Sequence, residues 1–356
     1  MKKEVFPLKK YMTRMGDGYR VELSEEEIWE DIKAGMEDAV SRGGVPELSG
    51  EEQQKLFDII TMPGTVVGVE FGKEVVMTSD SGAGKVGHLA GIQIDRIIGA
   101  QIHERVCAND SVDLGHIDYT YKAVKAVMHD EAADMQHTVN NTVMPLLYGA
   151  MTNLGQYTKP DGPCDNWAEL LPQGKIKEAL AAQEEAVEHA VKDIVYIGDG
   201  MYECGADGMN FDTCGASGDA DFLAALKAVS ILREKHPDMG VEMGMAGEFV
   251  LGMHGGLTFD GKRLAGMYPH EQVKVCEAAG ATIFGAVVNT NTNESLPWNL
   301  ARVCTFLKAC TDAATIPVHA NVGMGVCAIP MTDFPAIDAV SRIDKALVEV
   351  AKVDGF

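Results

Sequence analysis

Residues 281–289 read ATIFGAVVN, residues 297–314 read PWNLARVCTFLKACTDAA, and residues 317–322 read PVHANV. The first and third segments are short apolar runs, and the segment between them has the length and apolar spacing of a helix. Strands that alternate with single helices form the βα units of a parallel sheet. The runs show little alternation, as expected for strands that are buried on both faces. These segments therefore predict an α/β fold.

The same unit recurs along the second half of the chain. Strand entries follow one another at intervals of 36, 40, 36 and 36 residues, at Gly205, Val241, Ala281, Pro317 and Val353. With an earlier strand at Met144, the pattern predicts five complete strands and a sixth that begins at Val353. A (β/α)8 barrel needs eight strands, so we expect a TIM-type (β/α)8 barrel that is incomplete at the C-terminus. An open doubly wound sheet is the alternative, but its Gly-rich first βα turn is missing.

The chain before this repeat is irregular. Ser24 and Ser49 each precede a Glu by three residues, which is the capping-box spacing of a helix start. Residues 64–69 and 75–78 are short β-like runs. We therefore predict an N-terminal α+β extension over residues 1–140 that packs on a partial barrel over residues 141–356.

Composition limits the function classes. The 356 residues carry a net charge of −23, which argues against nucleic acid and anionic membranes as partners. No apolar run is long enough to span a membrane, and the N-terminus lacks the apolar stretch of a signal peptide. The eight cysteines form no C-x-x-C pair, so they indicate reduced thiols and a cytoplasmic protein. We also expect a homo-oligomer.

Polar side chains follow the predicted strands, where a barrel places its active site. A carboxylate, an imidazole and amides that converge there can orient a small polar substrate. We take Glu248, His319, Asn289 and Asn291 as candidate catalytic residues and Asp212 and Asn321 as candidate substrate-binding residues. The alternative is that several of them cap the helices that follow. No zinc signature occurs, and we expect no metal site.

Six stretches resemble the dimethylamine:corrinoid methyltransferases of methylotrophic methanogens and some anaerobic bacteria. The similarity extends from Met15 to Phe356, and the stretches that carry it are Gly115–Tyr119, Leu147–Met151, Gly205–Thr213, Met245–Glu248, Val288–Thr292 and Trp298–Arg302.

This resemblance implies a TIM-barrel enzyme of methanogenesis. Such an enzyme moves a methyl group from dimethylamine to the Co(I) centre of a cognate corrinoid protein and releases methylamine. The corrinoid is supplied by the partner protein, and no cofactor is bound directly. The resemblance also implies pyrrolysine, encoded by an in-frame UAG codon, and Val353-Asp354-Gly355 resembles the segment before it. We therefore expect pyrrolysine immediately after Phe356, and we expect the 356-residue product to be inactive alone.

The chemistry of amines agrees with this expectation. None of the twenty standard side chains is an electrophile that captures an amine, whereas the ring imine of pyrrolysine is one. Holding the captured amine in line with Co(I) would be a proximity effect. We assign the proton to Glu248 and orienting roles to Asn289, Asn291 and His319. Two alternatives remain, namely a TIM-barrel lyase or hydrolase and a module that docks the corrinoid protein without catalysis.

Overall fold

The computed structural model describes residues 9–70, 72–73, 75–79, 111–118, 124–142, 145–151 and 153–356. The chain begins with an antiparallel hairpin of β1 (Lys10–Arg14) and β2 (Arg20–Ser24), followed by helices α1 (Glu25–Gly43) and α2 (Gly50–Thr61). Both predicted capping boxes are confirmed. The side chains of Ser24 and Ser49 each accept from the backbone amide three residues later, and the Glu side chain at that position accepts from the backbone amide of the serine.

The centre of the molecule is a parallel sheet of seven strands in the order β11-β10-β7-β6-β5-β4-β3. The α/β class with a parallel sheet is thus confirmed. The strands are β3 (Met77–Ser79), β4 (Ser111–Asp118), β5 (Leu146–Met151), β6 (Gly208–Cys214), β7 (Gly240–Met245), β10 (Ile283–Ala286) and β11 (Val318–Ala320).

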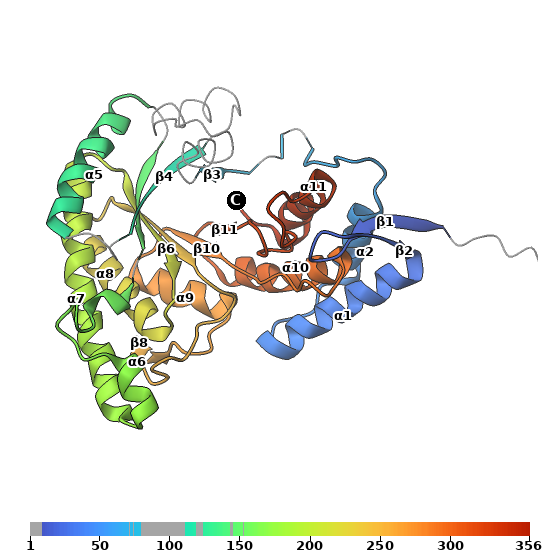
Figure 1. Ribbon diagram of the computed structural model, residues 1–356. Helices are drawn as coiled ribbons and strands as arrows, with labels where there is room; N and C mark the ends of the chain where they lie inside the picture. The colour runs from blue at the N-terminus through green and yellow to red at the C-terminus, as the bar shows by residue number, and fades with distance from the viewer. Residues whose placement is uncertain are drawn as a thin grey trace, which may run out of the picture.

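From β4 to β11, helices connect consecutive strands of this sheet and cover it on several sides (Figure 1). Two of them, α10 and α11, lie on the same flank as the N-terminal helices α1 and α2, and α1 packs closely on α10. The helices are α5 (Val124–Val139), α6 (Trp167–Leu170), α7 (Ile176–Glu203), α8 (Asp219–Lys235), α9 (Pro269–Ala279), α10 (Leu296–Ala313) and α11 (Ile337–Ala346). Shorter elements are 3-10 turns at Leu154–Tyr157 and Leu171–Gln173, a π-helical turn at Leu347–Ala351, and the small hairpin of β8 (Thr258–Phe259) and β9 (Lys262–Arg263).

The strand count from the sequence was wrong. Five complete strands were expected, whereas the sheet has seven, because β3 and β4 also belong to it. Both lie before residue 140, so the sheet begins inside the segment that was predicted to be an extension. A domain boundary at residue 140 stays a prediction. Met144, the expected start of one strand, lies outside the described residues.

The C-terminal residues join the two edge strands of the sheet. Gly355 forms parallel bridges to His319 of β11 and to Val76, the residue before β3. The backbone of Asp354 donates to Val318, and that of Phe356 donates to the Val76 carbonyl at 3.0 Å. In Figure 1 the C-terminus lies between β3 and β11. Residues 354–356 therefore pair with both edges of the sheet, where the sequence predicted only the start of a strand at Val353.

The two faces of the sheet differ in chemistry. Phe211, Met243 and Phe284 are fully buried and belong to one apolar cluster with helix residues such as Phe306. Because side chains alternate along a strand, the neighbouring residues Glu242, Gly244 and Gly285 lie on the opposite face, which we call the inner face. Among the described residues, no helix combines the length and the hydropathy required to cross a membrane.

Candidate active site

A carboxylate and an imidazole are in contact across the inner face. Glu242 of β7 and His319 of β11 are 1% and 5% exposed, and His319 Nε2 contacts Glu242 Oε1. Strand β10 lies between them, and its residue beside His319 is Gly285. A Cβ atom at Gly285 would lie 2.6 Å from His319 Nε2. The imidazole therefore reaches Glu242 only because this position has no side chain.

Two further polar side chains meet beside this pair. A Cβ atom at Gly244 of β7 would lie 3.2 Å from Asp212 Oδ1 and 3.6 Å from Asn321 Nδ2. Asn321 Nδ2 also points at the Met245 carbonyl, at 3.5 Å. The structure thus brings together Asp212, Asn321 and His319, three of the six residues predicted from the sequence.

Asp212 is placed by an irregularity in β6. The register with β7 shifts between Phe211 and Cys214, and Thr213 has φ of 53°. A β-branched residue rarely adopts positive φ, and such strain is typical of functional sites. A bulge of this kind redirects a side chain. The Thr213 amide donates to Asp212 Oδ1 at 2.7 Å, which fixes the carboxylate at the end of the strand.

Buried polar atoms without partners mark the same face. Asn210 of β6 lies directly beside Glu242 in the register and is 2% exposed. Within the described residues, Asn210 Oδ1, Glu242 Oε2 and His319 Nδ1 find no hydrogen-bond partner. Buried polar atoms are nearly always paired in native proteins, because an unpaired one is costly. These three atoms are therefore the ones that a bound polar ligand would satisfy.

The structure gives Glu248 a different role from the one predicted. Its two carboxylate oxygens accept from Arg302 at 2.9 and 2.5 Å, and Oε2 also accepts from the Asn289 amide at 3.1 Å. Arg302 in turn donates to Asp38 of α1 at 2.6 Å. Burial opposes the charge on Arg302, but its bonds to Glu248 and Asp38 raise the pKa of the guanidinium. Both oxygens of Glu248 thus bind Arg302 of α10, and Arg302 links them to α1 through Asp38. The role of Glu248 in handling a proton stays a prediction.

The two asparagines after β10 also have structural contacts. The Asn289 carbonyl accepts from Arg302 at 3.2 Å. The Asn291 amide donates to Asn299 Oδ1 at 2.7 Å, and Asn299 Nδ2 returns a bond to the Asn291 carbonyl. The alternative stated above, that these residues support the start of a helix, fits Asn291 best. Both asparagines are exposed, and their catalytic role stays a prediction.

Comparison with known proteins gives this site a context. A model of the family described as dimethylamine methyltransferase matches residues 9–356. The chain belongs to the dimethylamine methyltransferase family. The resemblance drawn from the sequence is thereby confirmed at the level of the family.

Solved structures show weaker likenesses to this family member. The homocysteine methyltransferase MmuM from Escherichia coli is 11% identical with a TM-score of 0.38, over 77% of this chain and 96% of that one. The carboxyl transferase domain of Rhizobium etli pyruvate carboxylase is 13% identical with a TM-score of 0.39, over 92% of this chain and 50% of that one. Both scores are low, and neither likeness bears on the activity of this chain.

Sequence reasoning missed Glu242 and Asn210 in this methyltransferase family member. Both lie within strands rather than after them, where we looked for polar groups. The signal was present, because Glu242 interrupts the apolar run from Val241 to Met245. A carboxylate in a strand that is buried on both faces needs a partner or a function.

One group of side chains has the chemistry of metal ligands. Donor atoms of Cys164, Glu185 and His189 lie within 4.8 Å of one another. Burial raises the pKa of the Cys164 thiol, which favours its neutral form. The Glu185 side chain is 57% exposed, and the His189 ring stacks on Tyr157. The expectation of no metal site stays a prediction.

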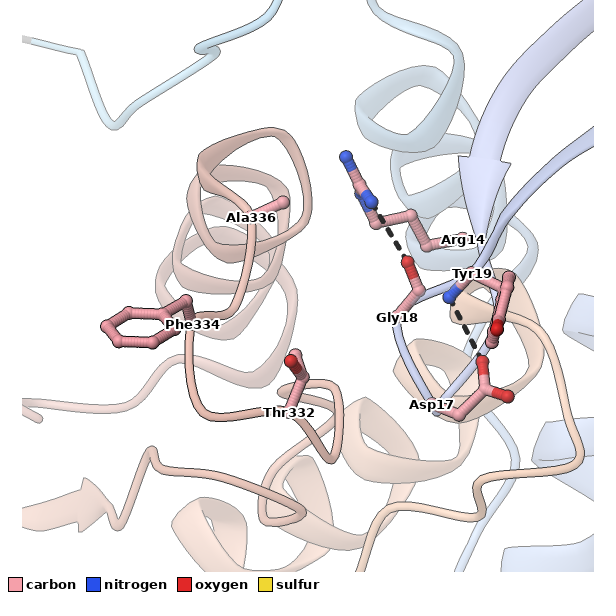
Figure 2. A pocket seen from close by; sticks show the side chains of 7 residues that line it. All are labelled: Arg14, Asp17, Gly18, Tyr19, Thr332, Phe334 and Ala336. Carbon is pink, nitrogen blue, oxygen red and sulfur yellow. Dashed lines mark hydrogen bonds between the residues drawn. The ribbon is translucent and has the colours of Figure 1, made fainter.

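A surface pocket of about 280 Å³ lies between the β1–β2 hairpin and the loop before α11 (Figure 2). Its charged group is already paired, since Arg14 donates to both oxygens of Asp338 at 2.8 and 2.9 Å and to the Gly18 carbonyl. Tyr19 and Phe334 at its rim are each 76% exposed. We therefore place the candidate site on the inner face, where buried polar atoms have no partner among the described residues.

Proposed function

We propose that this protein, in its full-length form with pyrrolysine, transfers a methyl group from dimethylamine to the Co(I) centre of a cognate corrinoid protein and releases methylamine. The single observation that carries the proposal is the inner-face cluster of Asp212, Glu242, His319 and Asn321, in a chain that matches the dimethylamine methyltransferase family over residues 9–356. We further infer a (β/α)8 barrel in which residues 353–356 act as the eighth strand, so the cluster would lie at its centre.

The charges of the cluster suit an alkylammonium ion. Dimethylamine is protonated at neutral pH, and its two N–H groups can donate to a carboxylate such as Asp212. A charge-assisted hydrogen bond of this kind is stronger than a neutral one. Asn321 lies beside Asp212 and would help to fix the orientation of the bound ion. Gly244 leaves room for its methyl groups, because no Cβ occupies that point of the inner face.

Methyl transfer also needs control of one proton. The Co(I) electron pair forms the new bond to carbon, and the pair of the broken C–N bond stays with nitrogen. If the nitrogen is protonated before the bond breaks, methylamine leaves as a neutral amine. His319, held by Glu242, can keep or accept a proton at Nδ1, which has no partner among the described residues. We assign the proton to this pair in place of Glu248.

We retain the proposal that pyrrolysine follows Phe356 in the full-length enzyme. Its ring imine would supply the electrophile that captures the amine. The register supports this placement, because Gly355 pairs with His319 and the second residue after it would share its face of the strand. That position would lie beside Asn321. The codon after Phe356 and the intact mass of the protein from its native host test this point, and any codon other than UAG would contradict it.

The activity is tested by methyl transfer from isotope-labelled dimethylamine to the reduced corrinoid protein. We expect Asp212→Asn and His319→Gln to lose at least tenfold in rate, and the exposed variant Glu188→Gln to retain it. Full activity in both site variants would refute the assignment of the cluster. Binding of the corrinoid protein without any methyl transfer would indicate a docking module, and transfer by the 356-residue chain alone would refute the need for pyrrolysine.

A further inference from the structure

A second cavity of about 280 Å³ lies next to the loops that follow three neighbouring strands. It is bounded by the 3-10 turn after β5, by the turn after β6 and by the loop after β7, and helices α6 and α7 close its base. These loops lie at the carboxyl ends of parallel strands, which is the end of a sheet where ligands bind in α/β proteins.

Asn153 and Ser217 line this cavity with half-buried and exposed side chains, and its buried polar group is the side chain of Gln183. It interrupts the apolar face of α7, where Ala179, Ala182, Ala186 and Val187 are buried. Gln183 is itself 2% exposed, and neither Oε1 nor Nε2 has a hydrogen-bond partner among the described residues. A buried carboxamide with both ends unpaired is costly, and an apolar residue would serve the packing of the helix better.

The walls of the cavity are mainly apolar. Leu154 is 1% exposed and Trp167 is half-buried, whereas Leu251 and Met253 at the rim are 46% and 49% exposed. A Cβ atom at Gly218 would lie 2.6 Å from Met253 Cγ, so Gly218 allows the methionine to lie over the turn after β6. Methionine is flexible and adapts to a ligand of irregular shape. A few polar groups on a mainly apolar surface are the usual composition of a small-molecule site.

We propose that this cavity binds a carboxamide group. Gln183 Nε2 would donate to the ligand's carbonyl oxygen, and Gln183 Oε1 would accept from the ligand's N–H. Only a group with an acceptor and a donor side by side satisfies both atoms. A carboxylate offers acceptors alone and would leave Oε1 unpaired, so it would bind more weakly.

Two sources can supply such a group. One is a free small amide. The other is a peripheral carboxamide side chain of a corrinoid, and this second source rests on the proposed function. The volume admits a side chain and not a corrin ring, since sites for whole drug-sized ligands begin at about 300 Å³. In the second case the cavity would hold one arm of the partner's corrinoid beside the active site.

Ligand-observed NMR on the whole chain tests the proposal, with propionamide, propionate and cobinamide as probes. We expect saturable binding of propionamide that is at least tenfold weaker in Gln183→Leu and unchanged in the exposed control Gln54→Leu. Propionate should bind at least tenfold more weakly than propionamide. Ser217→Phe fills the cavity from an exposed turn, leaves Gln183 in place and should also abolish binding.

The outcomes separate this site from the proposed function. Tighter binding of cobinamide than of propionamide, lost in Gln183→Leu, identifies the corrinoid as the source, and binding of propionamide alone identifies a free amide. Either result stands whether or not methyl transfer is observed. Absence of saturable binding for all probes, or equal binding in wild type and Gln183→Leu, would overturn the proposal and leave a cavity that holds only water.

Discussion

Replacing Glu248 by Gln would remove the negative charge that faces Arg302 while it keeps the shape of the side chain. In the structure this carboxylate is 4% exposed and accepts two hydrogen bonds from Arg302 and one from the Asn289 amide. The glutamine would present an NH2 group to the guanidinium, and Arg302 would keep only Asp38 as a charged partner.

The expected loss of stability follows from the cost of an uncompensated buried charge. Breaking a buried ion pair by removing one partner costs about 3–5 kcal/mol. Because Asp38 still neutralises Arg302, we expect the lower end, about 3 kcal/mol. That is a large share of the roughly 5–15 kcal/mol by which a folded protein is stable. Urea unfolding followed by far-ultraviolet circular dichroism measures it as a lower midpoint.

A surface pair provides the matched control. Glu188 contacts Lys227 at 2.6 Å, but its side chain is 59% exposed, so Glu188→Gln should cost less than about 1 kcal/mol. If Glu248→Gln also costs less than that, the structural role of Glu248 is wrong. If it keeps its stability but loses methyl transfer, the catalytic role that was predicted from the sequence is restored.

Three further substitutions have defined outcomes. Gly285→Ala should displace His319 from Glu242, because the new Cβ would lie 2.6 Å from Nε2; overpacking of this kind costs about 1–3 kcal/mol, whereas Gly240→Ala, with no atom nearer than 3.5 Å, should be close to neutral in the same urea assay. Burial raises the pKa of Asp344 from 3.8 to about 6, so its ionisation favours the unfolded state. The free energy of unfolding of the wild type should therefore decrease as the pH rises from about 4 to about 6. Asp344→Asn should be more stable than the wild type by up to about 3 kcal/mol at pH 7 and equal to it below pH 4. A difference that does not depend on pH would contradict this cause. Ser49→Ala removes the cap of α2 and should cost about 1 kcal/mol in thermal unfolding, with an unchanged melting temperature as the opposing result.

Helices were predictable because their periodicity is long enough to read. The helix expected over 297–314 is α10 (Leu296–Ala313), and α7 (Ile176–Glu203) buries residues at the same helical spacing. Strand β3 has only three residues, and β4 reads SVDLGHID, with polar groups and a glycine. Neither shows the continuous apolar run by which we recognised buried strands. The same limit hid the pairing of Gly355, which depends on two strands distant in the sequence.

The sequence predicted where the site lies better than it predicted which residues form it. Asp212, His319 and Asn321 were found because they follow strands, and parallel strands bring their carboxyl ends together. Glu248 satisfies the same rule, yet Arg302, 54 residues later, holds it in an ion pair. No local pattern in the sequence predicts this ion pair, because Arg302 contacts both Glu248 and Asp38 only where α10 packs against α1.

The inner face of the sheet is built at the expense of stability, and this argues for a ligand there. Gly244 and Gly285 leave space that larger side chains would fill, and filling it with apolar groups would add to the core. Instead, Asn210, Glu242 and His319 are buried there with polar atoms that have no partner among the described residues. Gly355 brings the C-terminal residues against His319, since its absent Cβ would lie 3.5 Å from the His319 Cβ. Local rules of packing fail where function requires it, and here they fail on β6, β7 and β11, on the same face of one sheet. A small cation that donates to Glu242 Oε2 and Asn210 Oδ1 would satisfy two of these atoms, and an alkylammonium ion is a donor of this kind.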